Sequence, residues 1–231
     1  MKIFGIDTTS KFLCVGAYDN GRIYDYNLQA GVRHSSLLVP AIKRITGALG
    51  WDLDDIDYFA CGIGPGSFTG IRVGMATIKA LAWSLRKPLV GVSSLEIIAR
   101  NFKIKEGTII PVIDAKRNLV YASAFRIRGE SLSRVMPYML LGVGELCKKF
   151  KGNVFVLGDA LTKYRMQITR DMPKAVILDA DYWYPQGHNI IRSALNNIKD
   201  RKIDTAYSIK PVYLYPKECQ IRENIKPRRK R

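Results

Sequence analysis

The chain has 231 residues, 47% of them hydrophobic, and its formal net charge at pH 7 is +17. This length suits one large domain or two small ones, and the apolar content is enough for a core and excludes the composition of a disordered chain. No apolar run reaches about 18 residues, the length that a membrane-spanning helix needs, so we expect no membrane segment.

The net charge and the spacing of the cysteines indicate which partners and which chemical sites to expect. A net charge of +17 invites a polyanionic partner such as nucleic acid, although the basic residues are scattered and the clearest cluster is the terminal run 226–231. No CxxC pair occurs among the four widely spaced cysteines, Cys14, Cys61, Cys147 and Cys219. We therefore expect a cytoplasmic protein with reduced thiols, and neither a disulfide frame nor a metal site.

The first part of the chain predicts an antiparallel meander followed by alternating helices and strands. An Asn-Gly turn at Asn20 separates two runs of strand composition. Apolar residues recur at helical spacing over residues 34–49, with Ser35 or Ser36 as the expected N-cap. The strands expected here lie over residues 2–7, 12–18, 22–28, 58–63 and 89–92.

The second part of the chain repeats some of this pattern. Ser93 with Glu96 three residues later is a capping box that predicts a further helix, and the charged stretch 101–107 is the expected domain boundary. A strand over 109–113 and a return strand over 119–126 resemble the first hairpin, which suggests a duplicated α/β unit. The remaining expected elements are a short helix over 145–151, strands over 153–157 and 175–178, an amphipathic helix over 187–199 and an extended segment over 211–216.

A glycine-rich turn follows the strand expected over residues 58–63, and it is the most distinctive stretch of the chain. Gly64 and Gly66 can adopt positive φ without steric cost, so the strand can turn directly into a helix. Ser67 is the expected N-cap of that helix. Free N–H groups of the first turn and the positive helix end point the same way, so the turn can cradle an anion.

The turn Asp7-Thr8-Thr9 is a second place where polar groups can face a phosphate. Local turn hydrogen bonds explain such residues equally well. The residues that we consider as anion-facing or nucleotide-facing are Asp7, Thr8, Thr9, Gly64, Gly66, Ser67 and Thr69.

The helix that follows the glycine-rich turn, over residues 70–85, is apolar around most of its circumference. Its clearly polar residues are Arg72, Thr77, Lys79 and Ser84. A helix of this kind is usually buried on more than one side. Two interpretations stay open: a central helix within one core, or a helix that lies between its own sheet and a partner chain.

Residue types that carry catalysis are scarce. His34 and His188 are the only histidines, and Leu38 stands where an HxxxH metal pair needs its second ligand. Ser67 does not lie in a GxSxG elbow, and helix capping explains it better than a nucleophilic role. Neither a Walker sequence nor a GxGxxG fingerprint is present. We therefore predict no catalytic residue, no bound metal and no cofactor.

Several segments, taken in order along nearly the whole chain, resemble the bacterial TsaB (YeaZ) family. The most specific is Gly-Pro-Gly-Ser-Phe-Thr-Gly-Ile-Arg-Val-Gly at residues 64–74. The others lie at residues 6–10, 34–40, 92–95, 114–115 with 120–121, and 211–214. The chain departs from the family pattern at Lys116, Leu119 and Tyr215, where the family usually has Arg, Glu and Arg.

The resemblance implies an α/β fold of the actin-like, Hsp70-like ATPase (ASKHA) class, with two related lobes that are each a mixed sheet flanked by helices. We expect residues 1–102 to form the N-terminal lobe with the partner-binding helices, and residues 103–186 to form a smaller second lobe. Residues 187–231 are expected to form a helix that packs back on the N-terminal lobe, followed by a basic tail.

The resemblance also implies a function and partners. Family members are non-catalytic subunits of the machinery that makes threonylcarbamoyladenosine beside the tRNA anticodon. The related subunit TsaD carries the HxxxH metal site and transfers the threonylcarbamoyl group, the ATPase TsaE joins the complex, and tRNA is reached through the complex. A member that is alone forms a homodimer.

In this family two N-terminal helices, here about residues 35–49 and 67–85, pack against the same helices of TsaD or of a second copy. Carried over to this chain, the expected interface residues are Ser35, Leu38, Ile42, Ile45, Phe68, Ile71, Arg72, Met75, Ile78 and Lys79. Two rival hypotheses are a stand-alone peptidase, which needs a nucleophile or metal ligands, and a basic RNA-binding module, which the net charge of +17 motivates.

Overall fold

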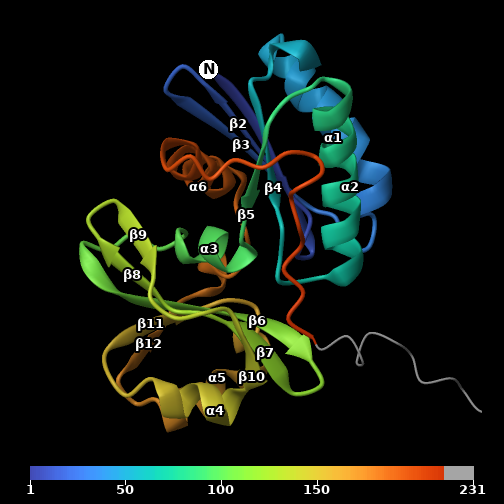
Figure 1. Cartoon of the computed structure of the whole chain (residues 1–231). Helices are drawn as coiled ribbons and strands as arrows, with labels where there is room; N and C mark the ends of the chain where they lie inside the picture. The colour runs from blue at the N-terminus through green and yellow to red at the C-terminus, as the bar shows by residue number, and fades with distance from the viewer. Residues whose placement is uncertain (216–231) are drawn as a thin grey trace, which may run out of the picture.

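The computed structural model describes residues 1–215, which form two lobes around two mixed sheets (Figure 1). The predictions for residues 216–231, including the basic run 226–231 and Cys219, lie outside the described residues. Within residues 1–215 no helix combines the length and the apolar character that a membrane span requires.

The first sheet has the strand order β3-β2-β1-β4-β5. Strands β1 and β2 and strands β2 and β3 pair antiparallel, whereas β4 pairs parallel with both β1 and β5. The bounds of these strands are β1 Lys2–Asp7, β2 Phe12–Asp19, β3 Arg22–Gln29, β4 Tyr58–Gly62 and β5 Leu89–Val92. The predicted meander is confirmed, with strand ends that differ by one residue.

Helices cover both faces of the first sheet. Helices α1 (His34–Leu49) and α2 (Phe68–Ser84) lie on one face, and α6 (Gly187–Lys199) lies on the other (Figure 1). Successive side chains of β1 point to opposite faces of the sheet. Phe4 and Ile6 pack with α1 and α2, whereas Ile3 packs with α6. The first sheet is therefore the middle of a three-layer lobe.

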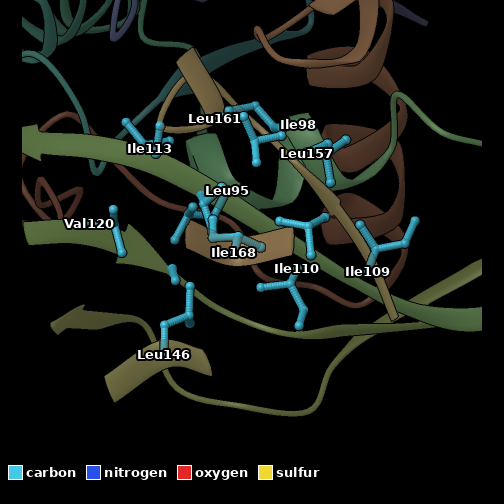
Figure 2. Close-up of a cluster of buried hydrophobic side chains, with 14 of the residues drawn as sticks. Leu95, Ile98, Ile109, Ile110, Ile113, Val120, Leu146, Leu157, Leu161 and Ile168 are labelled. Atoms are coloured by element: carbon cyan, nitrogen blue, oxygen red, sulfur yellow. The ribbon is translucent and has the colours of Figure 1, made fainter. Parts of the chain in front are cut away.

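The second sheet has the strand order β10-β7-β6-β11-β12, and a hairpin of β8 and β9 extends from β6. Helix α4 (Val143–Lys149), helix α5 (Leu161–Asp171) and helix α3 (Ser94–Ala99) pack against it, and Figure 2 shows side chains from all three in one core. The strand bounds are β6 Glu106–Lys116, β7 Leu119–Ala122, β8 Phe125–Arg128, β9 Ser131–Arg134, β10 Met139–Gly142, β11 Val154–Leu157 and β12 Ala175–Ile177.

The two sheets have the same strand topology. In the first sheet β1 pairs antiparallel with β2, which pairs antiparallel with β3, and β1 also pairs parallel with β4, which pairs parallel with β5. In the second sheet β6, β7, β10, β11 and β12 pair in the same way and in the same order. The duplicated α/β unit that the hairpins suggested is therefore present as a repeated topology. Short 3-10 turns at Leu53–Asp55 and Ala180–Tyr182 complete the described elements.

Several local predictions are wrong. The return strand expected over 119–126 breaks at Ser123 into β7 and β8. The sequence did not predict helix α5, because its N-cap residue, Ala160, has no capping side chain and the helix is polar outside a narrow apolar stripe. The sequence did not predict strands β9 and β10 either.

Two predicted caps are also wrong. Helix α1 begins two residues earlier than a Ser35 cap implies, with Arg33 as its N-cap residue and no side-chain cap. Ser93 precedes α3 as predicted, but its hydroxyl makes no capping hydrogen bond, and Glu96 instead forms an ion pair with Arg100 at 3.3 Å. Buried tertiary partners, rather than local capping, hold the start of α3.

Candidate partner-binding face and interlobe cleft

The glycine-rich turn between β4 and α2 has the expected shape with one difference. Gly64 has φ of +93°, which L-residues with a side chain rarely adopt. Gly66 does not have positive φ; it is required instead because a Cβ there would collide with the carbonyl of Thr9. Ser67 caps α2 as predicted, since its hydroxyl accepts from the Gly70 N–H at 3.2 Å.

The start of α2 packs directly on the turn between β1 and β2. The Thr8 hydroxyl donates to the Gly70 carbonyl at 2.7 Å, and the Ser67 N–H donates to the Thr9 carbonyl at 2.7 Å. A Cβ at Gly70 or Gly74 would overlap Thr8. The glycines of this block therefore allow helix and strand turn to approach closely.

Asp7 lies at the centre of this contact and is fully buried. Its carboxylate accepts from the Thr9 N–H and the Thr9 hydroxyl, both at 2.8 Å, and the Thr9 hydroxyl lies 2.8 Å from the Ser94 hydroxyl. Burial raises the pKa of Asp7 to about 6, although the Thr9 hydrogen bonds and nearby His34 oppose the shift.

The side chains of Asp7 and Thr8, two of the residues predicted to face an anion, are buried and hydrogen-bonded inside the lobe. Gly64 is buried as well. Thr9, Gly66 and Ser67 do border open space, since they line a cleft between the lobes, whereas Thr69 is exposed on α2 outside that lining.

The interlobe cleft has a volume of about 570 Å³. Asp114 and Asp159 line its far wall, and the Asp114 N–H donates to Asp159 at 2.9 Å. Burial alone would raise the pKa of Asp114, but the hydrogen bonds and charge of Lys116, 2.7 Å away, outweigh it and lower that pKa. Burial raises the pKa of Asp159. Among residues 1–215 no group of three or more His, Cys, Asp or Glu is placed to hold a metal ion.

The end of the described chain runs along this cleft. The Val212 N–H donates to the Ile63 carbonyl at 2.8 Å, and the Tyr213 ring packs on Phe68 with centroids 5.2 Å apart. The Tyr215 hydroxyl then donates to the Ala115 carbonyl in the second lobe at 2.8 Å. Residues 212–215 thus occupy one side of the cleft and bridge the two lobes.

The structure divides the expected interface residues into two groups. Ser35, Phe68 and Arg72 are exposed, and Ile45 and Lys79 are half-buried. The other expected interface residues are at most 6% exposed and belong to the core under the first sheet: Leu38, Ile42, Ile71, Met75 and Ile78. These residues lie on the inner side of each helix, which packs on its own sheet.

The outer sides of α1 and α2 still carry apolar and small residues. Val39 is 50% exposed, Ala76 and Ala80 are exposed, and Val73 is half-buried. We call these four residues the helix-pair face. The sequence pattern contained this second stripe, but without the sheet it did not show which stripe faces inward.

The repeated two-lobe topology defines an α/β protein of the actin-like, Hsp70-like ATPase class. A crystal structure of a Pseudomonas aeruginosa protein with similarity to peptidase YeaZ has the same fold, with a TM-score of 0.84 at 24% identity over 93% of this chain and 99% of that chain. The family model of TsaD, tRNA N6-adenosine threonylcarbamoyltransferase, matches residues 28–215.

Two curated relatives narrow the assignment. The tRNA threonylcarbamoyladenosine biosynthesis protein TsaB of Bacillus subtilis (strain 168) is 31% identical over 172 residues, which span 73% of this chain and 75% of that protein. TsaB of Escherichia coli (strain K12) is 26% identical over 225 residues, 93% of this chain and 94% of that protein. The chain belongs to the TsaB (YeaZ) family of tRNA threonylcarbamoyladenosine biosynthesis proteins.

Proposed function

We propose that this chain is a non-catalytic subunit of the tRNA threonylcarbamoyladenosine machinery and that it supports a TsaD-like transferase by pairing through the helix-pair face. The observation that carries the proposal is this face itself, where Val39, Ala76 and Ala80 are exposed and Val73 is half-buried at the edge of the core under the first sheet.

The helix-pair face suits helix-on-helix packing. Exposed Ala76 and Ala80 lie one turn apart on α2, so a partner helix can approach the backbone closely. Arg72 and Lys79 border the stripe and supply polar groups at its edge. Two helix pairs that pack face to face can bury about 1,200–2,000 Å², the usual range of stable protein interfaces.

The contacts of the two histidines support assigning the transfer chemistry to the partner. His34 is 6% exposed, and its Nε2 lies 3.2 Å from the Phe12 carbonyl. His188 Nδ1 lies 2.5 Å from the Asp25 carboxylate at the surface of the first lobe. Each imidazole thus has a structural partner. In this proposal a TsaE-like ATPase and tRNA join through the assembled complex, and the isolated chain forms a homodimer through the same face.

Light scattering after size-exclusion chromatography tests the proposal, on this chain alone and mixed with its cognate TsaD. Ala76→Glu and Val39→Glu place a charge on the exposed face, so we expect them to weaken pairing by about 100-fold or more while the fold is kept. Thr169→Glu, on exposed α5 in the other lobe, is the matched control and should pair as the native chain does.

Met75→Glu separates a surface effect from a folding effect, because Met75 neighbours Ala76 but is only 6% exposed. We expect it to lower the melting temperature strongly, since it buries a charge in the core. A heterodimer of unchanged affinity with folded Ala76→Glu and Val39→Glu variants would falsify the helix-pair face as the partner surface.

A further inference from the structure

A second exposed feature lies at the C-terminal end of α2, apart from the helix-pair face. Trp83 and Tyr207 are 63% and 81% exposed, yet the indole Nε1–H of Trp83 donates to the Tyr207 hydroxyl at 2.7 Å. Together with Arg86 and Lys87 they border an open hollow of about 810 Å³. We call these four residues the aromatic corner.

The aromatic corner is held in place by a fixed turn. Asp204 exchanges two backbone hydrogen bonds with Leu89 of β5, at 2.9 and 2.7 Å. The Ser208 hydroxyl donates to the Asp204 carboxylate at 3.0 Å and accepts from the Thr205 N–H at 2.9 Å. These hydrogen bonds hold the turn that places Tyr207 beside Trp83, so a ligand that binds there does not have to order this side chain.

The charge of the corner is positive. Among residues 1–215, Arg86 and Lys87 are the charged residues that border the hollow, and no carboxylate from this part of the chain borders it. Within residues 1–215 Arg86 forms no ion pair, and Lys87 donates to the neutral carbonyl of Asp54 at 2.8 Å. Because the charge of Lys87 also acts on the nearby Asp55 carboxylate, Arg86 is the positive charge that remains available to an anion that enters the hollow.

We propose that the aromatic corner binds an unpaired nucleotide of RNA. A base can stack on the exposed rings, which is how proteins hold single strands without reading sequence. The Tyr207 hydroxyl accepts from Trp83, so its own proton can be donated to a phosphate, and Arg86 adds charge for the backbone.

The chemistry of the hollow favours a nucleotide, because exposed aromatic rings lie beside the positive charge of Arg86. The proposal goes beyond the pairing function, because it concerns the chain without any other subunit. Failure of the helix-pair face in a pairing assay and failure of the corner in an RNA assay are therefore separate results.

Tryptophan fluorescence of the whole chain is a direct test. Trp83 is exposed, whereas Trp51 and Trp183 are only 7% and 9% exposed, so a base that stacks at the corner should quench Trp83 selectively. The probes are an unmodified tRNA transcript and a short single-stranded RNA. We expect quenching that saturates, that weakens steeply with salt, and that disappears in Trp83→Phe.

Variants connect the signal to the corner. Tyr207→Ala and Arg86→Gln should each weaken RNA affinity by about tenfold, through lost stacking and lost charge respectively. Tyr24→Ala on β3 and Arg165→Gln on α5 are matched controls at exposed positions in other parts of the molecule, and they should leave RNA affinity unchanged.

Three results would overturn the proposal. One is RNA binding that leaves Trp83 emission unchanged, which would assign the affinity to another basic segment. Another is equal loss of affinity in the control variants, which would indicate general charge attraction. The third is a Trp83 signal that responds to the cognate TsaD and not to RNA, which would make the corner a protein contact.

Discussion

Asp7 is the residue whose chemistry differs most from its expected role. A carboxylate beside a glycine-rich turn suggested a group that faces phosphate, but its oxygens accept hydrogen bonds from Thr9 inside the lobe. Because burial raises the pKa of Asp7 to about 6, the native state binds this proton more tightly than the unfolded chain does. Stability contributed by protonated Asp7 is therefore full below about pH 4 and is lost as pH rises through about 6.

Asp7→Asn removes this titration and keeps an acceptor for the Thr9 hydrogen bonds. We expect the free energy of unfolding of the variant, relative to the native chain, to increase between about pH 4 and pH 6 by up to about 3 kcal/mol. Urea unfolding at several pH values measures it, with Asp181→Asn at an exposed position of the second lobe as the control. Parallel pH profiles for Asp7→Asn and the native chain would show that Asp7 does not titrate in this range.

At the scale of elements, helix α2 is apolar around most of its circumference although only its inner side is buried in the core. Its inner side completes the core with Ile71, Met75 and Ile78, and its glycines let Thr8 approach. Helical spacing predicted α1, α2 and α6 well, because a long periodic pattern depends on local geometry. Hydropathy alone did not separate the inner stripe of α2 from the outer one, because both stripes are apolar and the sheet that distinguishes them is distant in sequence.

Two glycines within helices provide a matched test of close packing. A Cβ at Gly74 of α2 would overlap the buried Thr8 hydroxyl, whereas a Cβ at Gly47 of α1 would meet open space. We expect Gly74→Ala to lower the free energy of unfolding by about 1–3 kcal/mol through overpacking. Gly47→Ala should raise it by about 0.5–1 kcal/mol, because alanine favours the helix. Equal effects at both sites, measured by urea denaturation, would mean that Thr8 can move aside.

At the scale of the whole molecule, the two lobes are joined at more than one place. Helix α3 precedes the expected boundary near residue 102, but its Leu95 and Ile98 pack in the core of the second sheet (Figure 2). Helix α6 returns to the first sheet, and residues 212–215 cross the cleft. We propose residues 1–102, 103–186 and 187–231 as the units of the chain, with α3 as the joint between lobes.

Tyr215→Phe tests the bridge across the cleft, because it removes the hydroxyl that donates to Ala115 and keeps the ring. We expect faster amide exchange at the cleft edges of both lobes, consistent with loss of about 1 kcal/mol of local stability. Tyr213→Phe, whose ring packs on Phe68 within the first lobe, is the control. Unchanged exchange in Tyr215→Phe would indicate that other contacts alone hold the lobes together.

The sequence by itself indicated the family and the fold class through a resemblance, carried chiefly by the glycine block at residues 64–74, and it predicted most long elements from local periodicity. Only the tertiary structure decided which side of α2 is buried, that Asp7 points inward, and that Trp83 meets Tyr207. Each of these outcomes depends on contacts between residues far apart in the chain. A helical pattern states which residues share a side of the helix, and the packing of distant strands decides which side is inside.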